Sequence, residues 1–468
     1  MEKSMSKDIV KREKDIKDEG KQWPQVLAIW IASLTSLCSG CTFAWTSPSL
    51  PAIVNSDDYD ITEEEATWFT VIPPIAMMIS TPIISKLNDV IGRKKMLLAI
   101  GILHIINWIL VCFSRSIYVF YMARFVVGLA DACVFSALPM YIGEISTPVV
   151  RGRWGNILTF NIYFGQFAIN VLGSYLSIAQ VSYISICFPI LFVIMFPFMP
   201  ESPYFYAMKS RYDDARNSLK WFSRKEDIEP DFLILKSDVE RQLSEAGTWK
   251  ELFTIRSNRK ALSAGLFLRI VQQLGGISVF ATYTQLIFNK AGGNMSPQLS
   301  SIIFTGFIML LNFVAGFTLD LMGRKKAFMY SSLSSGIVLF CLSIYFYLDK
   351  YESQIDLTSL QWIPLTGMIL FVLCYSFGLG IVPTLMLGEL FSASIKVKGL
   401  CSLTIVFGVL ISTITKLFYV LDTNFGLFCP FLLFSFSCIV GSVLTIYFVP
   451  ETKGKTLEEI QQALKAKK

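Results

Sequence analysis

The sequence predicts an all-α membrane protein with about twelve transmembrane helices, arranged as two repeats of six helices. Three observations predict this fold class: the composition, the spacing of apolar segments, and motifs that occur once in each half. Hydrophobic residues make up 53% of the 468 residues and charged residues only 16%, whereas a soluble protein usually carries about 25% charged residues. The mean hydropathy of +0.54 also indicates that lipid is the main solvent.

Twelve segments of the sequence are apolar over the length that a helix needs to cross a bilayer, which is about 20 residues. The predicted spans cover residues 25–47, 66–87, 96–114, 118–140, 155–177, 181–199, 261–288, 298–319, 327–348, 362–388, 399–420 and 425–449. The stretch before the first span is mostly charged and has no apolar core, so the sequence predicts no cleavable signal peptide.

The loops between these spans differ in charge, and the difference predicts the orientation. Basic residues follow the even-numbered spans: Lys86, Arg93, Lys94, Lys95, Arg151, Arg153, Arg324, Lys325, Lys326, Lys396 and Lys398. The opposite loops carry few of them, and the first of these loops is acidic between Asp57 and Glu65. By the positive-inside rule, the even-numbered loops and both termini face the cytosol. We expect a multi-pass protein of the plasma membrane.

A long polar interruption separates the first six spans from the last six. It contains helical periodicity over Tyr212–Phe222 and Phe232–Leu243, which predicts amphipathic helices. The sequence therefore predicts five regions, namely a cytosolic tail (1–24), a six-helix bundle (25–200), a cytosolic helical linker (201–260), a second six-helix bundle (261–450) and a cytosolic tail (451–468).

Three signatures occur at equivalent places in the two halves. The first half has Asp89-Val-Ile-Gly-Arg93, Glu144 with Arg151, and Pro200-Glu-Ser202; the second half has Asp320-Leu-Met-Gly-Arg324, Glu389 with Lys396, and Pro450-Glu-Thr452. Matching signatures at matching positions indicate an internal repeat. Two parallel six-span halves are one of the known transporter architectures.

The charges of these signatures all fall on the predicted cytosolic side. Acids and bases at helix ends can pair there, so we predict a cytosolic gate that holds the two halves together in one state and opens in another. Its predicted members are Asp89, Arg93, Glu144, Arg151, Glu201, Asp320, Arg324, Glu389, Lys396 and Glu451. The alternative is that these charges only anchor helix ends at the membrane interface.

Six motifs give the chain a family resemblance. They are Arg124-Phe-Val-Val-Gly128, Pro139-Met-Tyr-Ile-Gly-Glu144, Arg151-Gly-Arg-Trp-Gly155, Pro200-Glu-Ser-Pro203, Gln272-Gln-Leu-Gly-Gly-Ile277 and Pro450-Glu-Thr-Lys-Gly-Lys-Thr456. On these motifs the chain resembles the sugar porter family of the major facilitator superfamily, and within it the insect facilitated trehalose transporters. The resemblance implies alternating access, in which the two halves rock about a central site and open it to one side at a time.

The resemblance also indicates which residues contact the solute. The corresponding positions are Gln272, Gln273, Ser278, Tyr283, Thr159 and Thr384. Amides, hydroxyls and an aromatic face suit the hydroxyl groups of a sugar. Several positions depart from the family: Ser278 stands in place of Asn, and Thr159 in place of Gln. Thr384 replaces a Trp, and Gly408-Val409 replaces an Asn-Trp pair, so the identity of the sugar stays open.

One arginine, Arg269, lies inside the seventh predicted span, one helical turn before Gln272 and Gln273. An ionisable group within a span is costly and is by default a functional hypothesis, so we include Arg269 among the substrate-binding candidates. The alternative is that its side chain snorkels to the cytosolic interface, about eight residues or ~12 Å away along the helix.

The single histidine, His104, and an acid in the fourth span, Asp131, fall at similar predicted depths, each roughly 13 Å from the cytosolic side. We predict a polar contact between them, with Asn107 as a further member. It is either a structural hydrogen bond or a proton-linked switch, because histidine titrates near physiological pH.

The sequence therefore predicts a facilitative transporter of a sugar, trehalose or a hexose, working by alternating access. The first predicted span has no acid of the kind that sugar–proton symporters of this family carry, which favours facilitated diffusion. Two alternatives stay open: a sugar sensor that does not transport, and a proton-coupled transporter of a non-sugar solute. We expect no enzymatic activity, cofactor, metal ion or nucleic-acid partner. The expected partners are a small sugar and the lipid bilayer, and the expected state is monomeric.

Overall fold

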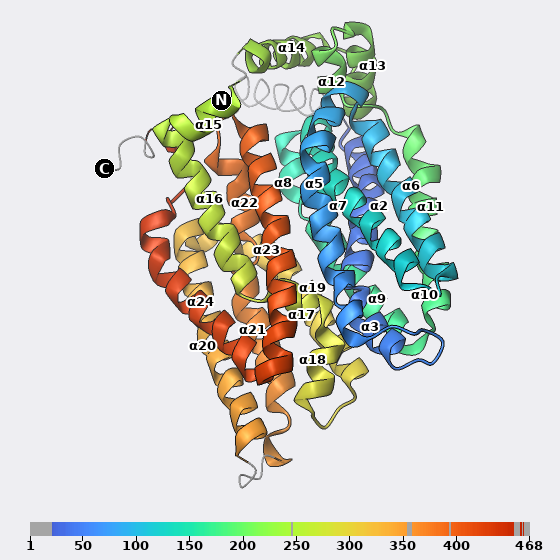
Figure 1. The fold of residues 1–468 in the computed structure, drawn as a ribbon. Coiled ribbons are helices and arrows are strands. Elements are labelled where there is room, and N and C mark those ends of the chain that lie inside the picture. Colours follow the sequence, from blue (N-terminus) through green and yellow to red (C-terminus); the bar gives the residue numbers. More distant parts are fainter. Residues whose placement is uncertain are drawn as a thin grey trace, which may run out of the picture.

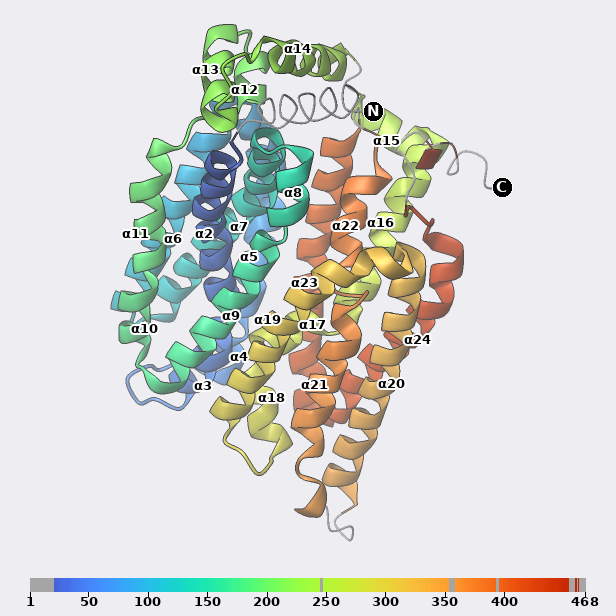
Figure 2. The same ribbon diagram turned by 180° about the vertical axis from the view of Figure 1, so that it is seen from behind.

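The part of the chain that the structure describes is built from helices. The structure is a computed structural model, and it describes residues 21–244, 247–352, 358–392, 395–453, 459, 460 and 462, with the backbone alone at 316–322, 358 and 388. Two bundles of helices stand side by side, and a layer of shorter helices covers one end (Figures 1 and 2). This is the predicted fold class, two helical repeats joined by a polar linker.

The first bundle holds the first six predicted spans. Its helices are α2 (Trp23–Ala44), α3 (Thr46–Val54), α4 (Glu63–Ala66), α5 (Trp68–Ile91), α6 (Arg93–Phe113), α7 (Ile117–Ile145), α8 (Pro148–Trp154), α9 (Ile157–Tyr175), α10 (Ile178–Ser185) and α11 (Cys187–Met195), followed by a 3₁₀ turn over Phe196–Phe198. Between α5 and α6, Gly92 has a φ of +104°. Only glycine takes this conformation without strain, so it marks a sharp turn between two helices.

The second bundle holds the last six predicted spans. Its helices are α16 (Arg256–Leu274), α17 (Ile277–Thr282), α18 (Thr284–Ala291), α19 (Pro297–Met322), α20 (Arg324–Tyr351), α21 (Ile363–Ser376), α22 (Val382–Leu390), α23 (Lys396–Phe425) and α24 (Phe428–Phe448), with a 3₁₀ turn over Thr358–Leu360. Gly323, between α19 and α20, has a φ of +85°. The sharp turn of the first bundle is thus repeated at the equivalent place in the second.

Four short helices form the linker: α12 (Pro203–Met208), α13 (Tyr212–Ser223), α14 (Glu229–Ser244) and α15 (Trp249–Thr254). We call the end of the molecule that they cover the linker end, and the opposite end the far end (Figure 1). The start of α2 is tied to this layer, because the backbone N–H of Lys21 donates to the carbonyl of Ser223 over 2.8 Å.

Nine helical segments within the described residues are long and apolar enough to cross a membrane. The predicted spans at 155–177, 261–288 and 362–388 are not among them. The first became α9, which contains Asn161, Gln166 and Asn170, and the other two are broken into shorter helices. These three spans are therefore the polar or interrupted ones, as expected of helices that line a solute path rather than face only lipid.

The apolar core shows how the two bundles are joined. One cluster of buried side chains runs from Trp45, Phe69 and Phe120 at the far end of the first bundle into the second bundle. A separate cluster fills the linker end of the first bundle, and within the described residues Phe407 is the one second-bundle side chain packed against it. The helix pairs α5–α23 and α9–α19 carry the contact between bundles. The bundles thus share a core at the far end and keep separate cores at the linker end.

Candidate solute-binding site and gates

The seventh predicted span is broken in its middle. α16 ends at Leu274 and α17 begins at Ile277, with Gly276 between them at a φ of +84°. A Cβ atom on Gly276 would lie 2.6 Å from the ring of Phe434, so both the backbone conformation and the space require glycine. Breaks of this kind expose backbone polar groups inside a membrane protein and are typical of solute sites.

The tenth predicted span is broken at the same level. α21 ends at Ser376 and α22 begins at Val382. In the break, a Cβ atom on Gly378 would lie 2.2 Å from the carbonyl oxygen of Ala327, so the chain approaches α20 as only glycine allows. The turn leaves carbonyl groups without a helical partner, and buried carbonyls need one.

Gln272 supplies that partner and joins the two broken helices. Its Nε2 donates to the carbonyl of Leu379 over 3.2 Å and to that of Gly380 over 3.0 Å, while its Oε1 accepts from Arg269 Nη1 over 2.7 Å. The amide is therefore fully used within the protein. Gln272, predicted as a solute contact, positions the site in this state.

Gln273 is the amide with a free donor. Its Oε1 accepts from the Ser278 hydroxyl over 2.5 Å, and its amide nitrogen donates to no side chain or backbone group that the structure describes. Ser278 in turn uses its hydroxyl on Gln273. The two predicted residues thus act as a pair, in which Ser278 orients Gln273 and Gln273 offers the NH₂ group to a solute.

The remaining predicted solute contacts separate into two places. Thr384 lies in the first turn of α22, is exposed, and accepts from Arg269 Nη1 at 3.5 Å. Thr159 lies near the linker-end start of α9 and is half-buried. Tyr283 lies elsewhere, because its hydroxyl shares a 3.0 Å hydrogen bond with Thr70 of the first bundle. The structure therefore places Tyr283 in a contact between the bundles.

Two further side chains near the breaks were not predicted. Asn312 of α19 has a buried Oδ1 without a hydrogen-bond partner in the described part of the chain, and a Cβ atom on Gly380 would lie 3.3 Å from that oxygen. Phe407 of α23 contacts Phe135 of α7 edge-on, with ring centroids 6.1 Å apart. The sequence showed Asn312 as a polar residue within a predicted span. Phe407 directly precedes Gly408-Val409, one of the places where the chain departs from the family.

Polar side chains close the far end across the two bundles. The Thr46 hydroxyl donates to the carbonyl of Thr282 over 3.0 Å, Gln285 Nε2 donates to Ser174 over 2.9 Å, and the Ser301 hydroxyl donates to Asn170 over 2.7 Å. Together with the Tyr283–Thr70 bond, they form what we call the far-end closure.

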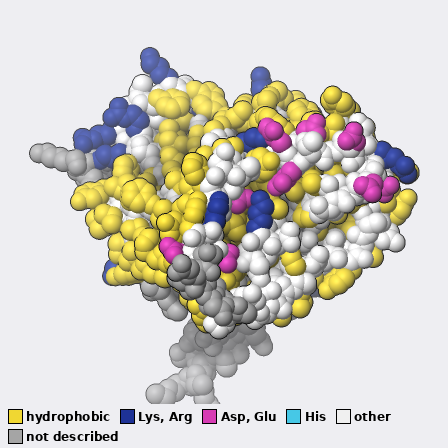
Figure 3. Space-filling model, turned by 60° about the horizontal axis from the view of Figure 1, so that its bottom comes forward, with side chains coloured by type: hydrophobic (Ala, Val, Ile, Leu, Met, Phe, Trp, Pro, Cys, Tyr) yellow, Lys and Arg dark blue, Asp and Glu magenta, His cyan; other side chains and the backbone are white. Residues whose placement is uncertain are grey.

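Two lysines of the second bundle reinforce this closure. Lys290 Nζ lies 2.7 Å from the buried carboxylate of Asp422 and 3.8 Å from that of Glu63 in the first bundle. Lys416 Nζ donates to the Thr67 hydroxyl over 2.9 Å and lies 5.2 Å from the ring centre of Trp68. Acidic side chains gather over one half of the far-end face (Figure 3), where Asp57, Asp58, Asp60, Glu64 and Glu65 are exposed.

At the linker end, the predicted gate residues of the first bundle form one cluster. Arg93, which is 1% exposed, pairs with Glu144 over 3.0 Å and with Asp89 over 3.3 Å. Glu201 accepts from the backbone N–H of Lys94 over 3.0 Å, so it caps the start of α6 as an acid near a helix N-terminus does. Burial raises the pKa of Glu201, although the backbone donors oppose the increase.

The second bundle repeats this cluster, but the pKa of its capping acid shifts in the opposite direction. Arg324 pairs with Glu389 over 3.2 Å, and Glu451 accepts from the backbone N–H groups of Arg324 and Lys325 at the start of α20. Burial acts to raise the pKa of Glu451, but these donors, with those of Thr452 and Lys453, outweigh it and lower the pKa. Asp320, the remaining acid of the repeat, has its side chain outside the described residues.

In this state the two clusters do not form the gate between the halves that the sequence predicts. Each ion pair of these two linker-end clusters lies within one bundle, rather than between the two. Glu144 and Arg151, which form one repeated signature, do not pair with each other: Glu144 pairs with Arg93, and Arg151 donates to the carbonyl of Gly143 at 3.4 Å. In the second half Glu389 likewise pairs with Arg324 and not with Lys396. The charge clusters stiffen each bundle separately in this state.

The predicted contact between His104 and Asp131 is also wrong. Asp131 Oδ1 accepts from the Ser39 hydroxyl of α2 over 2.6 Å. Both ring nitrogens of His104, and both polar atoms of Asn107, are buried without a hydrogen-bond partner among the described residues. Equal depth in neighbouring helices did not fix which face each side chain occupies.

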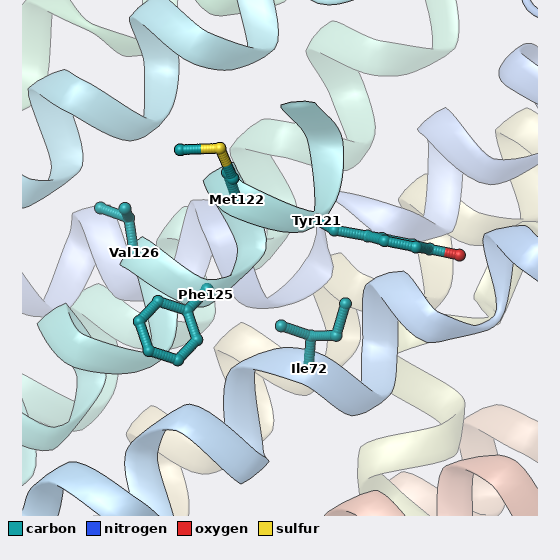
Figure 4. Close-up of a pocket in the computed structure, with 5 residues that line it drawn as sticks. All are labelled: Ile72, Tyr121, Met122, Phe125 and Val126. Atoms are coloured by element: carbon teal, nitrogen blue, oxygen red, sulfur yellow. The ribbon is translucent and has the colours of Figure 1, made fainter. Parts of the chain in front are cut away.

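A depression of about 350 Å³ on the first bundle is not a sugar site. Its lining residues are Ile72 of α5 and Tyr121, Met122, Phe125 and Val126 of α7. Figure 4 shows that the side chains around it are almost entirely apolar. The one hydroxyl, that of Tyr121, donates to the backbone carbonyl of Glu65 over 2.9 Å. Such a surface suits an acyl chain of the bilayer.

The two-bundle fold of this chain is shared with a solved sugar transporter. The solved structure of the xylose transporter XylE from E. coli, in a partially occluded inward open conformation, has the same fold. The TM-score is 0.76 at 18% sequence identity, over 92% of this chain and 99% of that chain. The chain therefore has the twelve-helix fold of the major facilitator superfamily.

Within that class, the chain belongs to the sugar (and other) transporter family, whose family model matches residues 28–464. The facilitated trehalose transporter Tret1 of Bombyx mori is 32% identical over 444 residues, which cover 94% of this chain and 87% of that protein. Trehalose transporter 1 of Drosophila melanogaster is 32% identical over 448 residues, and these cover 52% of its length. The family resemblance read from the sequence motifs is confirmed.

Proposed function

We propose that this protein carries a sugar, with trehalose or a hexose as the leading class, across a membrane by alternating access. One observation carries the proposal: the broken helices α16/α17 and α21/α22 meet through Gln272 in the interior of a two-bundle fold. Broken helices at the interface of two repeats are where transporters of this architecture bind their solutes. The trehalose transporters among the relatives support the choice of sugar.

The state seen here is proposed to be open toward the linker end. The far-end closure joins the two bundles by hydrogen bonds and by a shared core. We assign the linker end to the cytosol, because Lys and Arg concentrate in the loops on that side and such loops stay cytosolic. The plasma membrane is the proposed location, with both termini in the cytosol.

The site is proposed to offer Gln273, Thr384 and Asn312 to the hydroxyl groups of the sugar. Gln273 contributes a free NH₂ group, Thr384 an exposed hydroxyl, and Asn312 an unpartnered carbonyl oxygen. Amide and hydroxyl groups with unused donors or acceptors are what a sugar must satisfy for specific binding. Gln272 and Ser278 hold these groups in place.

The cytosolic gate is proposed to use the cations that the two clusters leave over. Arg151 of α8 and Lys396 at the start of α23 have no carboxylate partner within the described residues. They stand at the linker end of opposite bundles. Closing this end brings the bundles together, and each of these two cations can then pair with a carboxylate of the opposite half.

A second candidate mechanism is proton-coupled transport. It is favoured by Asp131, a buried acid in α7 whose carboxylate is hydrogen-bonded to Ser39 of α2. The first span has no acid of its own, but α7 places the Asp131 carboxylate against Ser39 of α2. A buried carboxylate at a helix interface of a membrane protein is a common proton site.

The test is uptake of radiolabelled trehalose and glucose by oocytes, at two external pH values. We expect saturable uptake by the wild-type protein and at least a tenfold loss for Gln273→Ala, with Tyr118→Phe on the lipid-facing surface as the matched control. Uptake that does not change with pH supports facilitated diffusion, whereas a pH dependence that disappears in Asp131→Asn supports proton coupling. Surface expression without uptake of either sugar contradicts the proposed function and favours a sensor.

A further inference from the structure

Arg269 is an intramembrane cation whose hydrogen-bonding capacity is only half used. Its Nη1 donates to Gln272 over 2.7 Å and to Thr384 at 3.5 Å. Its Nε is buried without a hydrogen-bond partner in the described part of the chain, and Nη2 likewise donates to no described residue. The Nε–Nη2 edge, the side of a guanidinium that matches the two oxygens of a carboxylate, therefore has no partner among the described residues.

The charge of Arg269 is also unbalanced. No carboxylate whose side chain the structure describes forms an ion pair with it, whereas Arg93, Arg324 and Lys290 all have one. A buried charge without a counter-charge is costly. A buried cation whose N–H groups are partly unused is therefore a candidate to bind an anion.

The bland alternative, an arginine that snorkels to the membrane interface, does not fit the geometry. Arg269 lies about eight residues, or ~12 Å along the helix, from the start of the predicted span at residue 261. Its guanidinium bonds to Gln272, one turn further into the membrane, and not toward the linker end. The side chain therefore points into the site.

The guanidinium has contacts on two sides that favour one orientation. Its central carbon lies 4.7 Å from the ring centre of Phe407, and Phe407 is fixed by its contact with Phe135 of the other bundle. Stacking on an aromatic ring keeps the guanidinium plane fixed and leaves its edge available. With Nη1 fixed by Gln272 and Thr384, the free edge is preorganised, which reduces the entropy lost when a ligand binds.

We propose that the Nε–Nη2 edge of Arg269, on its Phe407 platform, binds the carboxylate of the solute, so that this transporter prefers sugar acids such as uronates over neutral sugars. The inference rests on the proposed function, because it names the substrate class of the same site. A carboxylate is chosen over a phosphate because one unpaired cation neutralises one negative charge, and a sugar phosphate carries nearly two at neutral pH. Gln273, Thr384 and Asn312 remain available for the hydroxyl groups.

The test is counterflow in proteoliposomes, which does not depend on the orientation of the protein. Vesicles that contain the purified full-length protein are loaded with unlabelled glucose, and entry of radiolabelled glucose is measured against glucuronate, glucose 6-phosphate and glucosamine as competitors. For the wild type we expect glucuronate to compete about tenfold better than unlabelled glucose, because a charge-assisted bidentate pair strengthens binding by this order. Glucose 6-phosphate and glucosamine should compete no better than glucose.

Three variants separate charge, geometry and folding. Arg269→Gln should abolish the advantage of glucuronate over glucose, measured as the ratio of the two competition constants within the same variant. Arg269→Lys keeps the charge without the fork, so it should keep only part of the advantage. Lys236→Gln in the linker helix α14 removes one positive charge far from the site. It should change neither the advantage of glucuronate nor the rate of glucose counterflow. The melting temperature of each variant checks that the protein is folded.

Each contrary outcome has a definite meaning. Glucose counterflow in which glucuronate has no advantage overturns the carboxylate site and leaves the proposed function standing. Stronger competition by glucose 6-phosphate overturns the choice of a carboxylate. Equal loss of glucose and glucuronate binding in Arg269→Gln shows a positioning role and also overturns the site. No counterflow of any sugar by the folded wild type contradicts the proposed function itself.

Discussion

The two ends of this molecule are held by different kinds of contact. At the far end, hydrogen bonds cross from one bundle to the other, and the apolar core is continuous. At the linker end, the strongest charge clusters stay inside each bundle, and the first bundle has a core of its own. The comparison teaches that the repeated charge motifs make each half rigid, while uncharged and weakly paired groups at the far end decide whether the halves meet.

Replacing Arg93 should have the largest effect. Arg93→Met leaves the carboxylate of Glu144 without its partner in a largely buried site, and breaking a buried pair costs about 3 kcal/mol or more. We expect a large decrease in the melting temperature in detergent. Arg324→Met should cost less, because Arg324 is 12% exposed and Arg93 only 1%. An equal or larger effect of Arg324→Met would break the comparison between the two clusters.

Removing the charge of Lys290 should have the next largest effect. Lys290→Met removes the contact with Glu63 across the bundles and leaves the buried Asp422 carboxylate of the second bundle unpaired. Because the crossing pair is partly exposed, we expect the far-end closure itself to lose about 1 kcal/mol. The measurement is the labelling rate of a cysteine introduced at Ser278, with the native cysteines replaced by serine. Labelling from outside by an impermeant maleimide should rise at least fivefold. The double variant Lys290→Met/Asp422→Asn should restore the melting temperature but not the closure, because the contact with Glu63 stays lost.

A smaller effect is expected from a single neutral hydrogen bond of the far-end closure. Tyr283→Phe removes the bond to Thr70 and should cost about 1 kcal/mol, because the ring keeps its contact with Phe418. In the same labelling assay the rate should rise by roughly fivefold. Thr70→Val should produce the same shift, and the double variant no more than either single variant. Additive effects would show that the two hydroxyls do not act as a pair.

The smallest effect concerns pH and separates the two linker-end clusters. Glu451 has a lowered pKa in the folded protein, so its contribution to stability is present above the unfolded pKa and is lost as the pH falls through the folded pKa. Glu201 has a raised pKa, so its ionised form opposes folding and this cost fades as the pH falls. Melting temperatures of Glu451→Gln should therefore depend less on acid than those of the wild type. Glu201→Gln should show a steeper loss than the wild type, and the reverse order would contradict the assignment.

The fold could be predicted largely from the sequence. A bilayer selects apolar segments of a fixed length, and basic loops fix their orientation. The breaks in two spans were not predicted, although a signal was present: residues 261–288 and 362–388 are the longest predicted spans, and Gly275-Gly276 and Gly378 lie inside them. A helix that is too long and carries glycines in its middle is a candidate for interruption.

The site could be predicted only in part. The motifs indicated Gln272, Gln273 and Thr384, and the structure brings these residues to the broken helices together with Arg269. The role of each depended on contacts that no spacing shows. The amide nitrogen of Gln272 donates to carbonyl groups that have no helical partner in the second break. Asp131 faces Ser39 instead of His104 because packing sets the rotation of neighbouring helices.

The most direct test of the account measures both ends of the molecule at once. Spin labels are placed at the linker end on Val149 and Val397 and, in a second variant, at the far end on Tyr118 and Met295, all exposed positions. Pulsed electron–electron double resonance then gives the two distances between labels in lipid nanodiscs, with and without the transported sugar. The account predicts opposite changes, with the sugar shortening the linker-end distance in a fraction of molecules and lengthening the far-end distance in the same fraction. Distances that both stay constant, or that change in the same direction, would contradict rocking about a central site.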